Sequence, residues 1–76
     1  MVRKQSRAEL ELLRDRALAV LERVRADTKY RLRSKVEEIE AQVAIDALVE
    51  AEAALTRRGK WFVARRRLLL KMKYLR

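Results

Sequence analysis

The residues with the clearest chemical potential are the cations in the last part of the chain. Residues 57–76 contain nine Lys and Arg side chains and no Asp or Glu. Guanidinium and ammonium groups neutralise phosphates and release counterions, so this cluster predicts a nucleic-acid-binding surface. The predicted nucleic-acid-binding residues are Arg57, Arg58, Lys60, Arg65, Arg66, Arg67, Lys71 and Lys73. The cations Arg3, Lys4 and Arg7 are candidates for a second contact.

The same segment is rich in large apolar side chains. On a helical wheel Trp61, Leu68 and Met72 share one face, while Val63 and Leu70 lie nearly opposite. A helix with two apolar faces has more apolar surface than a three-helix core needs, so we expect one face to bind another copy or a partner. The predicted partner or oligomer interface consists of Trp61, Phe62, Leu68, Leu69, Met72 and Leu75.

Three functions are compatible with a basic and apolar segment of this kind. The first is binding of nucleic acid, DNA or RNA, although no recognised nucleic-acid-binding motif accompanies the cations. The second is a protein–protein adaptor, assembly subunit or inhibitor whose basic amphipathic helix docks in an acidic, apolar groove. The third is binding to an anionic membrane surface. We expect the first function, with the second as its main alternative.

The sequence contains few side chains that could perform enzymatic catalysis. The chain has no His and no Cys, so it lacks a ready general base near neutral pH and a strong nucleophile. The hydroxyl groups of Ser6, Thr28, Ser34 and Thr56 stand where helix caps and turns are expected. The Glu clusters have no accompanying His, which favours a solvated surface over a metal site. We therefore predict a non-enzymatic protein without a metal site or cofactor.

Length and charge limit the choices further. A chain of 76 residues makes one domain at most, and without disulfides or zinc its remaining common source of stability is self-association. We expect a single α-helical domain over residues 1–76, completed by homo-oligomerisation or by an obligate partner. No apolar run approaches the roughly 20 residues that span a bilayer, so a cytoplasmic protein is expected.

Charge is distributed in three blocks. Residues 1–35 hold eleven basic and five acidic side chains, a net charge of +6. Residues 36–56 hold six acidic and no basic side chains, and residues 57–76 have a net charge of +9. The acidic block can pair with either basic block, within the chain or between chains. The surplus of +9 that remains attracts polyanions.

The elements that would position these residues are helices. The chain has no Pro, a single Gly and many Ala, Leu, Glu, Arg and Lys residues, which favour helix nearly throughout. We expect an all-α bundle or hairpin with helices at about residues 7–27, 29–57 and 60–75. Ser6 with Glu9 predicts the start of the first helix as a capping box. Gly59 after two Arg residues predicts the stop of the second helix.

The boundary between the first two helices is left open by the sequence. Asp27 or Thr28 could cap the second helix, or Ser34 with Glu37 could start it later as another capping box. Alternatively, one unbroken helix could run from about residue 7 to residue 57, because apolar residues recur every eleven positions. That repeat consists of Leu10, Leu21, Leu32, Val43 and Ala54. Residues 28–33 also alternate like a short β-strand. We favour three separate helices.

Stripes of apolar residues predict the faces on which the helices pack. In the first helix the predicted stripe is Leu10, Leu13, Ala17, Val20, Leu21 and Val24. In the second helix it is Leu32, Val36, Ile39, Val43 and Ala47. Further along, the apolar surface of the second helix widens, which indicates more than one packing neighbour. The widening adds Ala44, Ile45, Leu48, Val49, Ala51 and Leu55.

Overall fold

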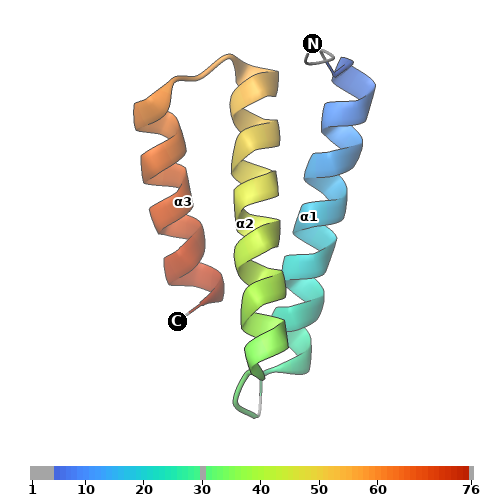
Figure 1. Ribbon diagram of the computed structural model, residues 1–76, viewed down its shortest axis with the longest axis vertical. Helices are drawn as coiled ribbons and strands as arrows, with labels where there is room; N and C mark the ends of the chain where they lie inside the picture. Colours follow the sequence, from blue (N-terminus) through green and yellow to red (C-terminus); the bar gives the residue numbers. More distant parts are fainter. Residues whose placement is uncertain (1–4, 30, 76) are drawn as a thin grey trace.

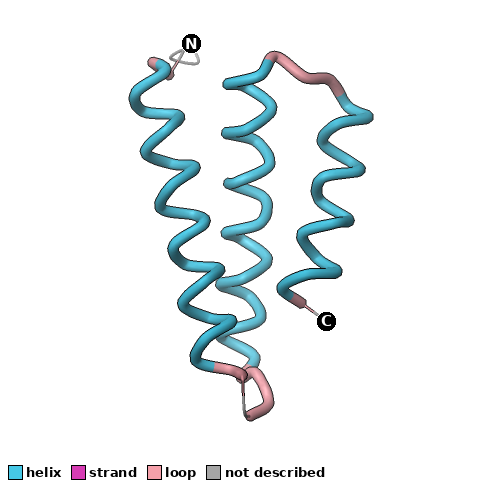
Figure 2. Tube along the Cα trace, turned by 180° about the vertical axis from the view of Figure 1, so that it is seen from behind, coloured by secondary structure: helices cyan, strands magenta, loops and turns pink. Residues whose placement is uncertain are grey.

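The predicted all-α bundle is confirmed by a computed structural model that describes residues 5–29 and 31–75. The described residues form three helices, α1 (Arg7–Asp27), α2 (Lys35–Thr56) and α3 (Lys60–Tyr74). α2 lies between the other two helices and runs antiparallel to both (Figure 1). The two connections are short and lie at opposite ends of the bundle (Figure 2).

α1 begins and ends at hydroxyl side chains. At its start the Glu9 N–H donates to Ser6 Oγ at 3.2 Å. At its end the Thr28 hydroxyl donates to the Val24 carbonyl at 2.7 Å, and the Thr28 N–H donates to the same oxygen at 3.0 Å. Thr28 therefore closes α1 and does not open α2.

α2 begins at the later of the two predicted capping boxes. The Glu37 N–H donates to Ser34 Oγ at 3.2 Å, and the Ser34 N–H donates to Glu37 Oε1 at 2.9 Å. The start predicted at residue 29 is thus wrong by six residues, because this reciprocal cap satisfies donors that would otherwise be orphaned. The unbroken helix and the strand are also wrong for the described residues between α1 and α2, where neither element is present.

The predicted end of the second helix at about residue 57 is confirmed to within one residue, since α2 ends at Thr56, but Gly59 is not the residue that closes it. Arg57 is in the left-handed region (φ 55°, ψ 36°), and the Arg58 N–H donates to the Ala53 carbonyl at 3.0 Å. This bond closes a Schellman-type end, in which Gly is the usual left-handed residue. Gly59 instead has φ −91° and precedes the first residue of α3. The chain therefore carries a non-Gly residue where left-handed backbone costs about 1 kcal/mol.

The core lies where α1 and α3 meet α2. It consists of Ala17, Leu21, Val24, Ala41, Ala44, Ile45, Leu48, Val49, Leu70 and Tyr74. The stripe predicted for the second helix is wrong, because Val36, Ile39 and Val43 are 66%, 56% and 63% exposed. Leu32 is 93% exposed, so the eleven-residue repeat forms no common packing face. α2 has two apolar stripes, and its neighbours cover the one that contains Ile45 and Leu48.

The C-terminal end of α3 is held by the end of α1 and the connection after it. Arg33 donates from Nη1 to the Tyr74 carbonyl and from Nη2 to the Leu75 carbonyl, both at 2.7 Å. The Tyr74 hydroxyl donates to Glu22, and the Arg25 guanidinium lies 6.0 Å from the centre of the Tyr74 ring. Burial, with the bond to Glu22, raises the pKa of Tyr74 to about 12. These contacts fix which face of α3 points outward.

Candidate binding surface on the C-terminal helix

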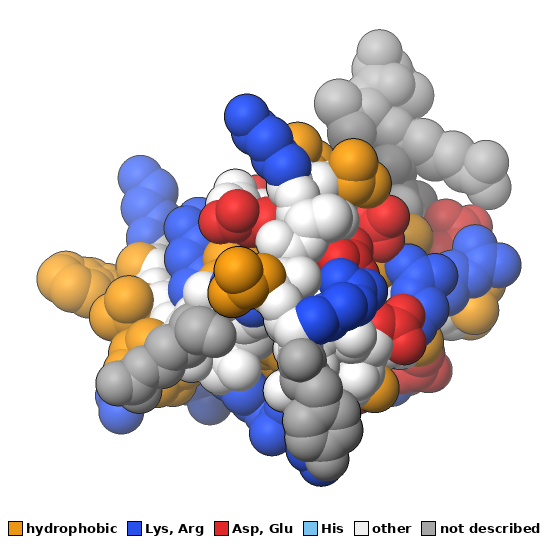
Figure 3. Space-filling model, turned by 90° about the horizontal axis from the view of Figure 1, so that it is seen from below, with side chains coloured by type: hydrophobic (Ala, Val, Ile, Leu, Met, Phe, Trp, Pro, Cys, Tyr) orange, Lys and Arg blue, Asp and Glu red, His pale blue; other side chains and the backbone are white. Residues whose placement is uncertain are grey.

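One side of α3 packs on the core, and this exposes the opposite side. Leu70 and Tyr74 are buried, and Val63 packs against them. Trp61, Leu68 and Met72 are 91%, 60% and 52% exposed. These three residues form the outer stripe of α3, since spacings of seven and four positions keep them on one helical face. Seen from below, hydrophobic side chains gather at the left edge, which α3 forms, with Lys and Arg on both sides (Figure 3).

The other three predicted interface residues lie elsewhere on α3. Leu69 is 47% exposed and lies to the side of the outer stripe. Phe62 is half-buried, with the Arg58 guanidinium 5.9 Å from the centre of its ring. Leu75, which directly follows the last residue of α3, is partly buried and packs against the core. The structure therefore brings only half of the predicted interface set onto one face.

Two of the predicted nucleic-acid-binding cations face α2. Arg66 Nε lies 2.9 Å from Glu52 Oε1, and its Nη2 donates to Glu52 Oε2 at 3.3 Å. Arg67 Nε lies 3.0 Å from Asp46 Oδ1. Both ion pairs join α3 to α2, so these two cations are neutralised within the fold and position the helix.

The remaining cations of the predicted set lie away from α2 carboxylates. Arg57, Lys60, Arg65 and Lys71 form no ion pair within the part of the chain that the structure describes, and we name them the free cations of α3. Arg58 covers Phe62, and Lys73 Nζ lies 5.2 Å from the centre of the Tyr74 ring. The free cations start at the helix end beside Trp61 and continue along both sides of the outer stripe.

The predicted second contact is described only in part. Arg3 and Lys4 lie outside the described residues. Arg7 Nε lies 3.2 Å from Glu11 Oε1 on the surface of α1. The start of α1 and the start of α3 lie at the same end of the bundle (Figure 1). Arg7 is therefore at the end of the molecule where Lys60 begins α3.

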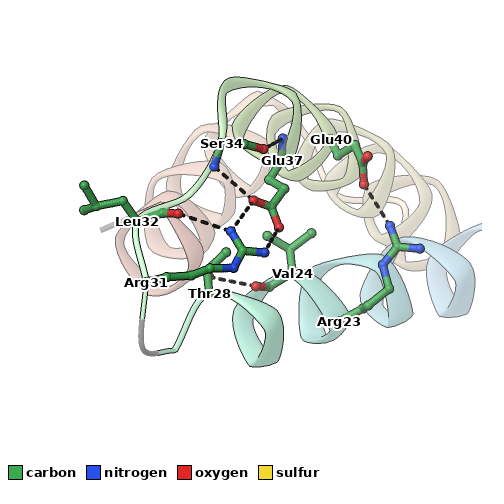
Figure 4. A network of polar contacts seen from close by, with 8 residues as sticks. All are labelled: Arg23, Val24, Thr28, Arg31, Leu32, Ser34, Glu37 and Glu40. Carbon is green, nitrogen blue, oxygen red and sulfur yellow. Dashed lines mark hydrogen bonds and ion pairs between the residues drawn. The ribbon is translucent and has the colours of Figure 1, made fainter.

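The acidic block of the sequence pairs with both basic blocks inside the same chain. Besides the two pairs with α3, Arg23 Nη2 lies 2.8 Å from Glu40 Oε2 and Arg31 Nη2 lies 2.7 Å from Glu37 Oε2 (Figure 4). The hydrogen bonds from Arg31 and from the Ser34 backbone lower the pKa of Glu37 to about 2. The same pair raises the pKa of Arg31. Internal charge matching, one of the two arrangements that the sequence allows, is thus present.

Comparison with known proteins gives no match, since no family model fits the chain and no curated protein or solved structure is significantly similar to it. Within residues 5–29 and 31–75, no three metal-ligating side chains come together. None of the helices described carries an apolar stretch long enough to cross a bilayer.

Proposed function

We propose that this protein is a non-enzymatic binding protein that contacts nucleic acid through the outward side of α3. The observation that supports this most is the 91% exposure of Trp61 beside the free cations Lys60 and Arg65. A base that stacks on an exposed aromatic ring gains about 1–3 kcal/mol, while nearby cations contact the phosphates. This combination favours a single strand, because its bases are free to leave the stack.

The proposal divides the cations of α3 into two groups. Phosphate contacts belong to the free cations, with Arg58 and Lys73 at their margins, while Arg66 and Arg67 hold α3 against α2. Four phosphate contacts on a single strand give a slope of about −3 for log K against log salt concentration. Raising the salt from about 50 to about 200 mM should then weaken binding by roughly 50-fold.

The test is fluorescence anisotropy of labelled oligonucleotides titrated with the full chain. We expect Trp61→Ala and Arg65→Glu to weaken binding of a single strand at least tenfold, with the far-UV circular dichroism unchanged. Lys35→Glu is the matched control, since Lys35 is also an exposed cation without an ion pair to any described residue but lies at the start of α2. Equal weakening by Lys35→Glu would show that binding follows net charge and not the surface of α3.

The outer stripe supports a second candidate function, docking of α3 in an acidic, apolar groove of another protein. Trp61, Leu68 and Met72 present anchors along one helical face, as helices that bind in grooves do. Leu68→Ser with Met72→Ser separates the candidates, because it removes anchors and retains every cation. Loss of oligonucleotide binding in this variant would count against the phosphate-based proposal.

Binding to an anionic membrane surface is the third candidate function, and vesicle binding by the same variants tests it. If the outer stripe enters the membrane interface, vesicles with anionic lipid should bind through Trp61 more strongly than vesicles without it. We also propose that the protein is cytoplasmic and forms a homo-oligomer. Neither property depends on whether α3 binds nucleic acid, a protein groove or a membrane.

A further inference from the structure

A second apolar surface lies on the outer side of the α1–α2 hairpin. It is a groove of about 420 Å³, with Leu13 and Val20 on one wall and Ile39 and Val43 on the other. α3 contributes no residue to its lining among the described residues. The groove is therefore separate from the candidate site on α3.

The α2 wall of this groove contains Ile39, Val43 and Ala47 of the apolar stripe predicted for the second helix. Val36, Ile39 and Val43 recur at spacings of three and four positions and are each more than half exposed. With Leu13, 37% exposed, these side chains leave apolar surface on the order of 400 Å² uncovered, about the size of the largest apolar patch on a typical monomer, which is often functional. A single copy has no element left to cover it, since α1, α2 and α3 comprise the described helices.

The charges beside the groove differ between its two walls. Arg16 and Arg23 line the groove on the α1 side and Glu40 lines it on the α2 side. Glu50 lies beyond this lining, seven positions after Val43 and so on the same face of α2. Arg23 and Glu40 already form an ion pair across the groove at 2.8 Å. Arg16 and Glu50 form none within the described residues. One cation and one anion on opposite walls therefore remain unneutralised.

We infer that a second copy of this chain covers the groove, so that two α1–α2 hairpins form a four-helix dimer. A two-fold axis parallel to the helices places the α1 of each copy over the α2 of the other. Arg16 of each copy then faces the wall that carries Glu50 of the other, and the apolar walls meet between them. All neighbouring helices are antiparallel in this arrangement, as in antiparallel four-helix bundles.

The charge pattern is what selects a second copy as the occupant. A surface with a cation on one wall and an anion on the other complements itself after a two-fold rotation. The exposed apolar part of the face, on the order of 400 Å², is about half of the roughly 800 Å² per partner that a standard interface buries, so the charged rims have to contribute the rest. Such a dimer leaves both copies of α3 uncovered, so it doubles the candidate binding surface. The inference does not depend on what α3 binds.

The test is the oligomeric state of the full chain from about 1 to 100 µM, measured by sedimentation equilibrium. We expect a mass of twice the 9.0 kDa chain. Val43→Glu should give a monomer with unchanged helix content, because Val43 is 63% exposed and outside the core. Leu68→Glu is the control, since Leu68 is 60% exposed but lies on the outer stripe of α3.

A charge exchange tests the register of the dimer. Arg16→Glu should weaken association about tenfold, and adding Glu50→Arg should restore it. A monomer at every concentration would overturn the inference and leave the groove to a different protein. A dimer that dissociates with Leu68→Glu but not with Val43→Glu would overturn it as well, since association would then run through α3.

Discussion

Three successive Arg residues of α3 carry the same charge but differ in what they contact. Arg66 forms two hydrogen bonds with Glu52, and the two side chains are 37% and 22% exposed. Arg65 has no partner among the described residues and points outward. Arg66→Glu and Arg65→Glu change the net charge equally, so any difference between them reports the local contact.

The expected magnitude follows from this geometry. Loss of a partly exposed ion pair costs about 1 kcal/mol. A new Glu at position 66 also faces Glu52, and this repulsion adds about 1 kcal/mol after the side chains have moved apart. Arg66→Glu should therefore lower the free energy of unfolding by about 2 kcal/mol. Arg65→Glu should change it by no more than about 0.5 kcal/mol.

Urea denaturation followed by far-UV circular dichroism, at one protein concentration and low salt, measures the difference. With a slope of about 1 kcal/mol per molar urea for a small domain, the two midpoints should differ by roughly 1.5 M. Adding Glu52→Arg to Arg66→Glu should restore the midpoint, because the pair is then re-formed with reversed charges. Equal midpoints for the two single variants would refute the division of the cations into structural and free groups.

Three further predictions concern the ends of the helices. Arg57→Gly should raise the free energy of unfolding by about 0.5–1 kcal/mol, because Gly adopts the left-handed backbone at C′ without the penalty of a side chain; Arg58→Gly, measured by the same urea titration, should lower it. Tyr74→Phe should lower stability by about 1–2 kcal/mol at pH 7 by removing a hydrogen bond to a carboxylate. The raised pKa of Tyr74 stabilises the fold below pH 10, and this contribution is lost as the pH rises from 10.0 to about 12, so the Phe variant should lose less stability over that range. The lowered pKa of Glu37 stabilises the fold above pH 4.5 and is lost as the pH falls to about 2, so acid titrations of Glu37→Gln should show a flatter decline in stability.

The helical class and the starts of α1 and α3 could be predicted because their signals are local. A capping box needs only residues three positions apart, so Ser34 with Glu37 was one of the alternatives for the start of α2, although the favoured start at residue 29 was wrong. The end of α2 was predicted less well, since Gly59 is the obvious left-handed residue and the chain uses Arg57. Which residue takes that conformation depends on where α3 has to start.

The choice between the two apolar stripes of α2 could not be made from spacing. In the first half of α2 the exposed stripe has Val36, Ile39 and Val43, whereas the covered stripe has only Ala41 and Ala44 before Ile45, so side-chain size there favoured the wrong stripe. The decision depends on where α1 and α3 pack, and therefore on contacts between residues far apart in the sequence. The hydrogen bonds from Arg33 to the Tyr74 and Leu75 carbonyls, more than 40 positions away, are long-range contacts of this kind.

The sequence predicted which side of α3 carries the outer stripe, but it did not predict which cations of α3 form ion pairs with α2. A helical wheel places Trp61, Leu68 and Met72 opposite Leu70, and the structure has them on the outside. The wheel does not say which Arg meets a carboxylate, because that depends on the register of α3 against α2. For this reason the sequence predicts Arg65, Arg66 and Arg67 alike as nucleic-acid-binding cations.

The most direct test of the proposed function uses the fluorescence of Trp61, the only Trp in the chain. A single-stranded oligonucleotide is titrated into the protein at about 50 mM salt, and the salt is then raised to about 200 mM, where phosphate contacts weaken. The account predicts quenching of Trp61 emission in step with binding and recovery of the emission at the higher salt. Binding seen by anisotropy without any change in Trp61 emission would contradict it, since the strand would then lie away from the outer stripe.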